Sequence, residues 1–209
     1  MVDAAHWLRA WRELGVSDSP ELSRLYRDVL LRYSEPHRHY HTRQHLAECF
    51  EKVQDIISLA EHPGEVLVGL WFHDAIYDTR RHDNEQRSAD WARATARELG
   101  AAVESAQRIH DLVMFTRHSA APVGVDAQVL VDADLSILGA PPARFQEYEA
   151  QVRSEYAWVP DEVFRSTRAR ILKELLGRSH LYSTAHFQER YEPPARRNLQ
   201  QSLKDLEGL

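Results

Sequence analysis

The chain has 209 residues, a hydrophobic content of 43%, a charged content of 28% and a formal net charge of −6. These values predict one soluble globular domain, and no apolar run is long enough to span a membrane. The negative charge argues against a nucleic-acid polymer as partner, because such binding depends on clustered Lys and Arg. The single cysteine, Cys49, excludes an intramolecular disulfide and a thiolate-rich zinc site. We expect a cytoplasmic protein, since Asp3 stands where a secretory signal would be basic.

Hydrophobic spacing is helical almost throughout the chain, and no alternating strand of useful length is found. We therefore expect an all-α fold, a compact single-domain bundle of many helices. In chain order, the predicted helices cover about residues 3–14, 19–34, 41–60, 65–78, 84–99, 101–116, 125–138, 142–157, 160–176 and 193–206. The motifs lie within about residues 35–140, and the helices of 142–209 are expected to pack on that core.

Two ionisable residues, His73 and Asp74, interrupt a segment that is otherwise fit for burial. An isolated buried carboxylate is so costly that it normally becomes neutral, pairs with another group or binds a cation. The neighbouring imidazole favours a metal cation. A second apolar segment is interrupted by Asp132 and Asp134. Together, the two interruptions predict a metal site.

Helical geometry indicates which of these side chains point inward. Asp134 shares a helix face with Val131 and Leu138, whereas Asp132 falls on a more polar face. By the same reasoning His45, at the edge of an apolar stripe, is an inward imidazole. One divalent ion would then be bound by His45, His73, Asp74 and Asp134. This set of nitrogen and oxygen donors suits Mn, Fe, Co, Ni, Zn or Mg, whereas Cys49 is expected to be a buried structural thiol.

The order of these residues resembles the HD superfamily of metal-dependent phosphohydrolases, in which a histidine, a His-Asp pair and a distant aspartate all lie on helices. The segment with His41 and His45 looks like the helix start of the related cyclic-nucleotide phosphodiesterases. Residues 132–136 resemble their distal segment, and this alignment also selects Asp134. The resemblance covers residues 41–139 well and the C-terminal part of the chain more loosely.

A bacterial branch described only as predicted HD phosphohydrolases resembles this chain in more detail. The similarity lies in residues 71–77, in Asn84-Glu85 and in Ser88-Ala89. In the alarmone-hydrolase branch, a glutamate occupies the position of Tyr77. This departure argues against alarmone hydrolysis.

The resemblance also implies catalytic roles. His41 matches the phosphodiesterase histidine thought to protonate the leaving oxygen. Asp78 follows the His-Asp pair by one turn, and Glu85 follows it in the region where nucleotidase relatives place a catalytic acid. Both acids equally fit ordinary places at a helix end and in a first helical turn.

A basic rim would let an acidic protein bind a small anionic phosphorylated substrate. The candidate substrate-binding residues are Arg43, Arg80, Arg117 and His118, with Arg81 as a further cation. A guanidinium makes bidentate contacts with phosphate, although each arginine also fits an ordinary solvated surface. His118 could reach a substrate or a second metal.

The leading hypothesis is a metal-dependent phosphohydrolase that cleaves a small phosphoester, a nucleotide or a related phosphorylated metabolite. One alternative is an HD-type di-iron oxygenase, which needs two further histidines between the His-Asp pair and the final aspartate. Of His82, His110 and His118, only His118 is well placed for that role. Another alternative is a non-catalytic nucleotide-binding HD module, and a homodimer regulated by its ligand stays open.

Overall fold

The computed structural model describes residues 3–208, and within that range it contains helices and no β-strand. The α-helices are α1 (Ala4–Glu13), α2 (Pro20–Arg32), α3 (Arg43–Val53), α4 (Pro63–Phe72), α5 (Asn84–Glu98), α6 (Val103–Met114), α7 (Val125–Asp134), α8 (Pro142–Glu155), α9 (Asp161–Leu176), α10 (Ala185–Arg190) and α11 (Glu192–Glu207). The 3-10 helices are η1 (Ile57–Leu59), η2 (Phe115–Arg117) and η3 (Leu135–Gly139). The predicted all-α fold is confirmed. Among the described residues, no helix is long and apolar enough to cross a membrane.

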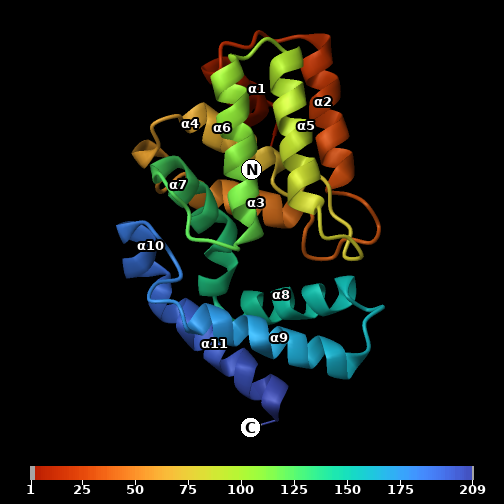
Figure 1. Cartoon of the computed structure of the whole chain (residues 1–209), viewed down its shortest axis with the longest axis vertical. Helices are drawn as coiled ribbons and strands as arrows, with labels where there is room; N and C mark the ends of the chain where they lie inside the picture. The colour runs from red at the N-terminus through yellow and green to blue at the C-terminus, as the bar shows by residue number, and fades with distance from the viewer. Residues whose placement is uncertain (1–2, 209) are drawn as a thin grey trace. The chain divides into compact units, whose positions relative to one another are not determined.

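The chain forms two compact units, one ending at Asp134 and the other beginning at Leu135. The first unit contains α1 to α7, and the second contains η3 and α8 to α11 (Figure 1). All four predicted metal ligands therefore belong to the first unit. The single domain expected over the whole chain stays a prediction.

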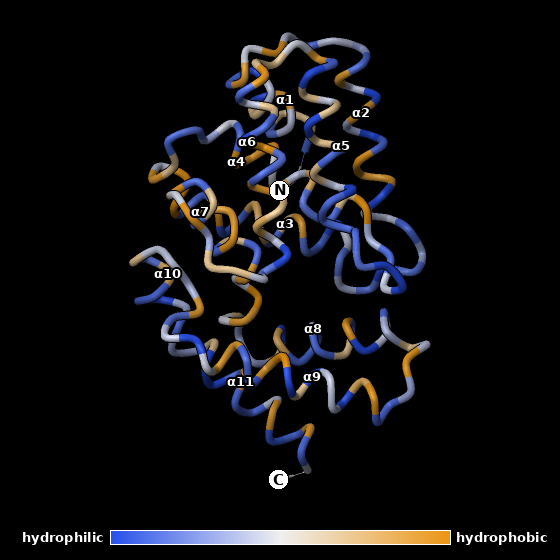
Figure 2. Tube along the Cα trace, in the orientation of Figure 1, coloured by the Kyte–Doolittle hydropathy of each residue, from blue (hydrophilic) through white to orange (hydrophobic). Residues whose placement is uncertain are grey.

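Helix α4 is the centre of the first unit. Every residue from Gly64 to Phe72 is buried, as expected of a helix that is apolar all round. Its neighbours α1, α3, α5, α6 and α7 cover it, and the ring of Trp71 packs edge-to-face on Trp7 of α1 at 5.1 Å between centroids. Burying one large apolar side chain contributes roughly 1.5–3 kcal/mol. A peripheral helix such as α2 instead alternates between hydrophilic and hydrophobic positions (Figure 2).

Two glycines let neighbouring helices approach α4 closely. A Cβ atom at Gly64 would lie 2.6 Å from the Cβ atom of Glu13 on α1. A Cβ atom at Gly69 would lie 2.9 Å from Cδ1 of Leu130 on α7. These contacts fix the position of the helix that leads directly into His73.

Helix α4 ends at Phe72, not near Asp78 as predicted. His73 is therefore the C-cap of α4, and Asp74 lies beyond the helix. The helix ends there because of tertiary contacts. Side chains from distant segments bind the backbone of residues 74–78 and replace the helical hydrogen bonds. These contacts form part of the candidate site.

Helix α3 differs from the predicted helix at both ends. It begins at Arg43, because Thr42 is the N-cap and its hydroxyl accepts a hydrogen bond from the backbone N–H of Gln44 at 3.3 Å. His41 therefore precedes the helix. After Val53 the helix does not continue to residue 60, because the backbone bonds tighten to the i→i+3 pattern and lead into η1, which packs on α7.

The helix predicted to reach residue 138 changes to the 3-10 helix η3 after Asp134. The hydroxyl of Tyr182 donates to the carbonyl of Leu135 at 3.1 Å. The amide of Asn198 donates to the carbonyl of Leu138 at 2.8 Å. Side chains of the second unit thus take the carbonyls that a continuing α-helix would have used.

The second unit is held by α8, α9 and α11. Helix α11 packs on α9 and η3, and Arg168 of α9 pairs with Glu149 and donates to the hydroxyl of Tyr148, both on α8, the latter at 2.8 Å. Helix α10 lies between the predicted helices of residues 160–176 and 193–206, in a stretch where no helix was predicted. A helix of 6 residues is marginal by itself, but the buried ring of Phe187 stacks on Tyr191 at 4.6 Å.

Candidate metal centre

Four predicted ligands from three separate segments converge in the first unit. The Nε2 atoms of His45 and His73 lie 3.0 Å apart. Oδ2 of Asp74 lies 3.4 Å from Nε2 of His45 and 3.1 Å from Nε2 of His73. Oδ1 of Asp134 lies 3.3 Å and 3.5 Å from the same two nitrogens. The ends of α4 and α7 and the first turn of α3 therefore bring these donors to one point.

The separations between donor atoms suit a single ion. Donors about 2.1 Å from an ion lie about 3.0 Å apart in octahedral geometry and about 3.4 Å apart in tetrahedral geometry. The five separations that involve a histidine Nε2 range from 3.0 to 3.5 Å and cover this interval. Two carboxylates would also balance the charge of a divalent cation. A group formed by His45, Cys49, His73 and Asp134 could hold a metal ion. Asp74 lies beside this group, with its Oδ2 within 3.4 Å of Nε2 of both histidines.

The ring of His73 is oriented by its second nitrogen. Nδ1 donates a hydrogen bond to the carbonyl of Leu70 at 2.7 Å. Because a carbonyl only accepts, the proton of the neutral ring is on Nδ1 and the lone pair is on Nε2. Metal-binding histidines commonly have this kind of support from a backbone carbonyl.

The cluster is closed on the histidine side and more open on the carboxylate side. The side chains of His45 and His73 are 3% and 0% exposed, whereas those of Asp74 and Asp134 are 17% and 11% exposed. Burial opposes ionisation of both carboxyls, but the histidines outweigh it, above all His73, and lower the pKa of Asp74 and of Asp134 well below the ordinary range. The two carboxylates are thus charged and suited to a cation.

Cys49 lies beside the cluster, and its sulfur falls within 4.8 Å of donor atoms of His45, His73 and Asp134. Its sulfur is 3.6 Å from Nδ1 and 3.7 Å from Nε2 of His45. Because the two distances are nearly equal, the thiol packs against the imidazole ring and not at the lone pair of either nitrogen. Burial raises the pKa of the thiol. The expected buried position of Cys49 is confirmed.

His118 contacts a predicted ligand directly. Its Nε2 lies 3.1 Å from Oδ2 of Asp134. It follows η2 with a backbone φ of +52°, in the left-handed region that few residues other than glycine adopt. Asp132, which the sequence places on a more polar helix face than Asp134, is fully buried. Most of the C-terminal half of α7 is buried as well.

The three predicted catalytic residues differ in their surroundings. The ring of His41 lies 5.7 Å from that of His45 and stacks on Tyr77 at 4.1 Å. The carboxylate of Asp78 accepts a hydrogen bond from the backbone N–H of Arg80 at 2.9 Å, which is a local turn contact. Glu85 is half-buried in the first turn of α5. His41 is thus beside the ligands, and the catalytic roles of all three stay predictions.

The predicted basic residues lie in exposed positions near the ends of helices. Arg43 is the first residue of α3, and Arg117 is the last residue of η2. Arg80 is in the loop that follows Asp78. Arg81 forms two hydrogen bonds of 2.7 Å with Asp83, so its charge is paired. Their binding of substrate stays a prediction.

Tyr33 is a site residue that was not predicted from the sequence. Its hydroxyl accepts a hydrogen bond from the backbone N–H of Asp74 and donates one to the carbonyl of Trp71, both at 3.2 Å. Tyr33 therefore joins the last turn of α4 to the ligand that follows it. No pattern in the sequence indicates this role, because a tyrosine near the end of an amphipathic helix is ordinarily part of the core.

Two residues of α5 hold the rest of the segment after the His-Asp pair. The hydroxyl of Ser88 accepts a hydrogen bond from the backbone N–H of Ile76 at 3.0 Å and lies 3.3 Å from its carbonyl. The side chain of Asn84 binds the N–H and the carbonyl of Asp78 at 3.2 and 2.9 Å. The sequence drew attention to Asn84 and Ser88 by resemblance alone, and these contacts supply a physical role.

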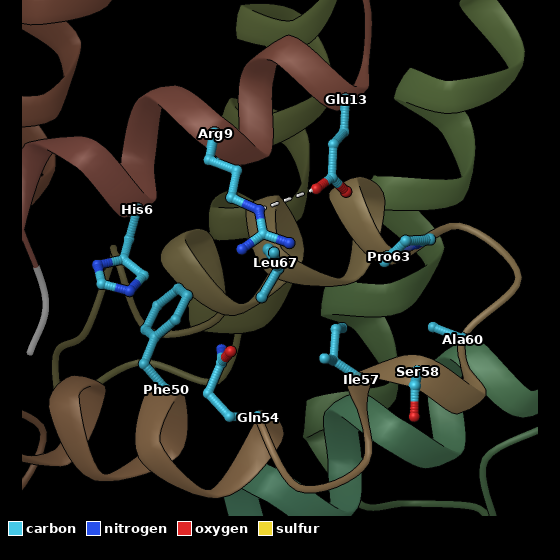
Figure 3. A pocket seen from close by; sticks show the side chains of 10 residues that line it. All are labelled: His6, Arg9, Glu13, Phe50, Gln54, Ile57, Ser58, Ala60, Pro63 and Leu67. Carbon is cyan, nitrogen blue, oxygen red and sulfur yellow. Dashed lines mark hydrogen bonds and ion pairs between the residues drawn. The ribbon is translucent and has the colours of Figure 1, made fainter.

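A cavity of about 290 Å³ opens elsewhere in the first unit, between α1, α3, η1 and α4 (Figure 3). Phe50 and Leu67 form apolar walls, and Arg9 pairs with Glu13 at 3.3 Å above them. None of the four predicted ligands lines this cavity. It is therefore separate from the metal cluster, although α3 and α4 contribute residues to both.

Comparisons of the chain with models of known protein families, with curated proteins and with solved structures found no match.

Proposed function

We propose that the chain is a metal-dependent phosphohydrolase of the HD type that cleaves a small phosphoester, such as a nucleotide or a related phosphorylated metabolite. The observation that supports it best is the convergence of two imidazoles and two carboxylates, with donor atoms 3.0 to 3.5 Å apart, from three separate segments. The order of these residues along the chain is that of the superfamily. His45, His73, Asp74 and Asp134 would hold the ion.

A divalent ion held there would lower the pKa of a bound water and offset negative charge on a phosphoryl group. The chain supplies the rest of the chemistry. The more exposed carboxylates of Asp74 and Asp134 mark the side from which a substrate can approach. His41, stacked on Tyr77 beside the cluster, is the proposed proton donor to the leaving oxygen. Arg43 and Arg117 are the proposed contacts with the phosphoryl group.

Metal content and metal-dependent turnover test the proposal together. We expect the purified chain to bind one ion and to hydrolyse at least one member of a panel of nucleotides and phosphomonoesters with Mn, Co, Ni or Mg. Replacing Asp74→Asn should lower kcat/KM by at least about 100-fold, because a ligand is lost. The exposed Asp111→Asn is the matched control and should retain activity. Full turnover by the Asp74→Asn protein would contradict the proposal.

A di-iron oxygenase is the second candidate, and His118 is the observation that bears on it. His118 lies 3.1 Å from the second oxygen of Asp134, where it could serve a second ion. His110, in contrast, contacts Asp111 at 2.9 Å and Asp90 at 3.6 Å. Two irons per chain with consumption of oxygen would favour this candidate. Nucleotide binding without turnover would instead favour a non-catalytic module.

A further inference from the structure

Arg38 is an arginine whose side chain is fully buried, in the loop between α2 and α3. A guanidinium stays protonated in proteins, and a buried charge is costly unless its donors are satisfied. One partner is the carboxylate of Glu35, which accepts from Nε at 3.1 Å. Its two terminal nitrogens, Nη1 and Nη2, donate to backbone carbonyls.

These carbonyls belong to the candidate site. Nη1 of Arg38 donates to the carbonyl of Asp74 at 2.6 Å and to the carbonyl of His41 at 3.2 Å. Nη2 donates to the carbonyl of Ala75 at 3.1 Å. A single nitrogen atom thus joins the backbone of a predicted metal ligand to that of the predicted proton donor, although 33 positions separate them in the sequence.

Aromatic rings hold the guanidinium in place. Its central carbon lies 5.3 Å from the ring centroid of Tyr33 and 5.5 Å from that of Tyr77. The hydroxyl of the same Tyr33 binds the backbone N–H of Asp74. The N–H and the carbonyl of Asp74 are therefore held by two side chains that also contact each other.

We propose that Arg38 is a positioning residue that sets the metal affinity of the centre and the placement of His41 relative to Asp74. It acts through the main chain and does not need to touch the ion or the substrate. Because Asp74 lies beyond the end of α4, the helix does not fix its carboxylate, and Arg38 and Tyr33 replace that support. The effect on turnover rests on the proposed hydrolase function, whereas the effect on metal affinity does not.

The variant Arg38→Lys tests this role. It keeps the positive charge, but an ammonium group cannot reproduce the fork of the guanidinium that binds several carbonyls at once. We expect the Kd for Zn²⁺ or Co²⁺, measured by calorimetry, to rise about 10- to 100-fold, as for other residues that support metal ligands. We also expect the visible absorption spectrum of the Co²⁺-loaded protein to change, because the ligand geometry changes.

The matched control is Arg108→Lys. Arg108 makes two hydrogen bonds of 2.7 and 2.6 Å with the buried Glu65 of α4. This variant also removes a guanidinium fork from the first unit, but at the other end of α4. It should lose thermal stability and keep the Co²⁺ spectrum and the metal affinity of the wild type. If Arg38→Lys also kept the Co²⁺ spectrum and the metal affinity of the wild type, the proposal would be overturned.

A milder variant covers the case in which Arg38→Lys does not fold. Glu35→Gln keeps a hydrogen-bond acceptor for Arg38 and removes its charge. We expect a several-fold rise in the Kd for Co²⁺, and unchanged binding would overturn the proposal. If the wild type binds metal but shows no turnover, the hydrolase function is overturned, and the role of Arg38 still stands on the Kd values of its variants for the metal. If the wild type binds no metal, the hydrolase function and the role of Arg38 are both overturned.

Discussion

At the scale of single residues, the site depends on hydrogen bonds that fix ring and backbone orientation. His73 shows this most simply, because the bond from Nδ1 to the carbonyl of Leu70 decides which nitrogen can accept a cation. Asp74 is held through its backbone by Tyr33 and Arg38. Candidate ligands could be predicted from the sequence, but these supporting bonds could not, since they join residues distant along the chain.

Removal of the Tyr33 hydroxyl isolates one of these bonds. We expect Tyr33→Phe to lower the free energy of unfolding by roughly 1–3 kcal/mol, because a buried N–H and a buried carbonyl lose their partner. Urea denaturation with circular dichroism measures this change. Tyr26→Phe, on the more exposed α2 surface, is the control and should cost less. Equal costs would contradict the role assigned to the hydroxyl.

The ionisation of Tyr33 leads to a prediction about the free energy of unfolding at alkaline pH. Burial raises the pKa of Tyr33 well above its ordinary value, and Asp74 adds to the effect. Because the pKa of Tyr33 is higher in the folded than in the unfolded protein, the neutral phenol stabilises the fold fully at pH values below the unfolded pKa of about 10. This stabilisation is lost as the pH rises toward the pKa of the folded state. We expect Tyr33→Phe to lose less stability than the wild type between pH 9 and 11, roughly the window of that ionisation. A parallel loss in the two proteins would show that other groups control the transition.

Cys49 allows a chemical test of the packing around His45. Its thiol is 1% exposed, and burial raises its pKa, so little thiolate is present at neutral pH. We expect a thiol reagent such as DTNB to react with the native protein far more slowly than with the urea-unfolded protein. Rapid reaction of the native protein would mean that α3 does not bury this face.

At the scale of helices, patterns in the sequence predicted where helices exist better than where they end. Helix α4 shows the reason. Its apolar residues predict a buried helix, but its last residue, Phe72, has neither glycine nor proline beside it. The helix ends there because Tyr33, Arg38 and Ser88 bind the backbone that follows. Helix propensity is a property of one segment by itself, whereas the side chains that make these hydrogen bonds belong to other segments of the fold.

The close packing of α4 gives a prediction about its glycines. At Gly64, a Cβ atom would meet the Cβ atom of Glu13 at 2.6 Å and the backbone oxygen of Ala10 at 3.1 Å. At Gly69, the nearest atom is the end of the Leu130 side chain, which can move. We expect Gly64→Ala to destabilise the protein by about 1–3 kcal/mol, and Gly69→Ala to cost less. The reverse order in urea denaturation would contradict this packing.

At the scale of the whole molecule, the predicted ligands are confined to one compact unit. All four lie in residues 3–134, and Asp134 is the last residue of that unit. An ion that binds only the folded state stabilises it by about 2.7 kcal/mol at 100 times its Kd. We expect added Zn²⁺ to slow hydrogen exchange in α3, α4 and α7. EDTA should reverse the effect, and slowing confined to α8 and α9 would place the ion elsewhere.

The sequence by itself determined that this protein is helical and that His45, His73, Asp74 and Asp134 are the candidate ligands. Both inferences follow from local physics, since apolar spacing predicts helices and an ionisable residue in an apolar segment requires compensation. Only the tertiary structure decided that these donors lie 3.0 to 3.5 Å apart and that a buried arginine holds the backbone beside them. Such contacts depend on how distant segments pack, because a helix pattern gives the direction of a side chain but not its partner.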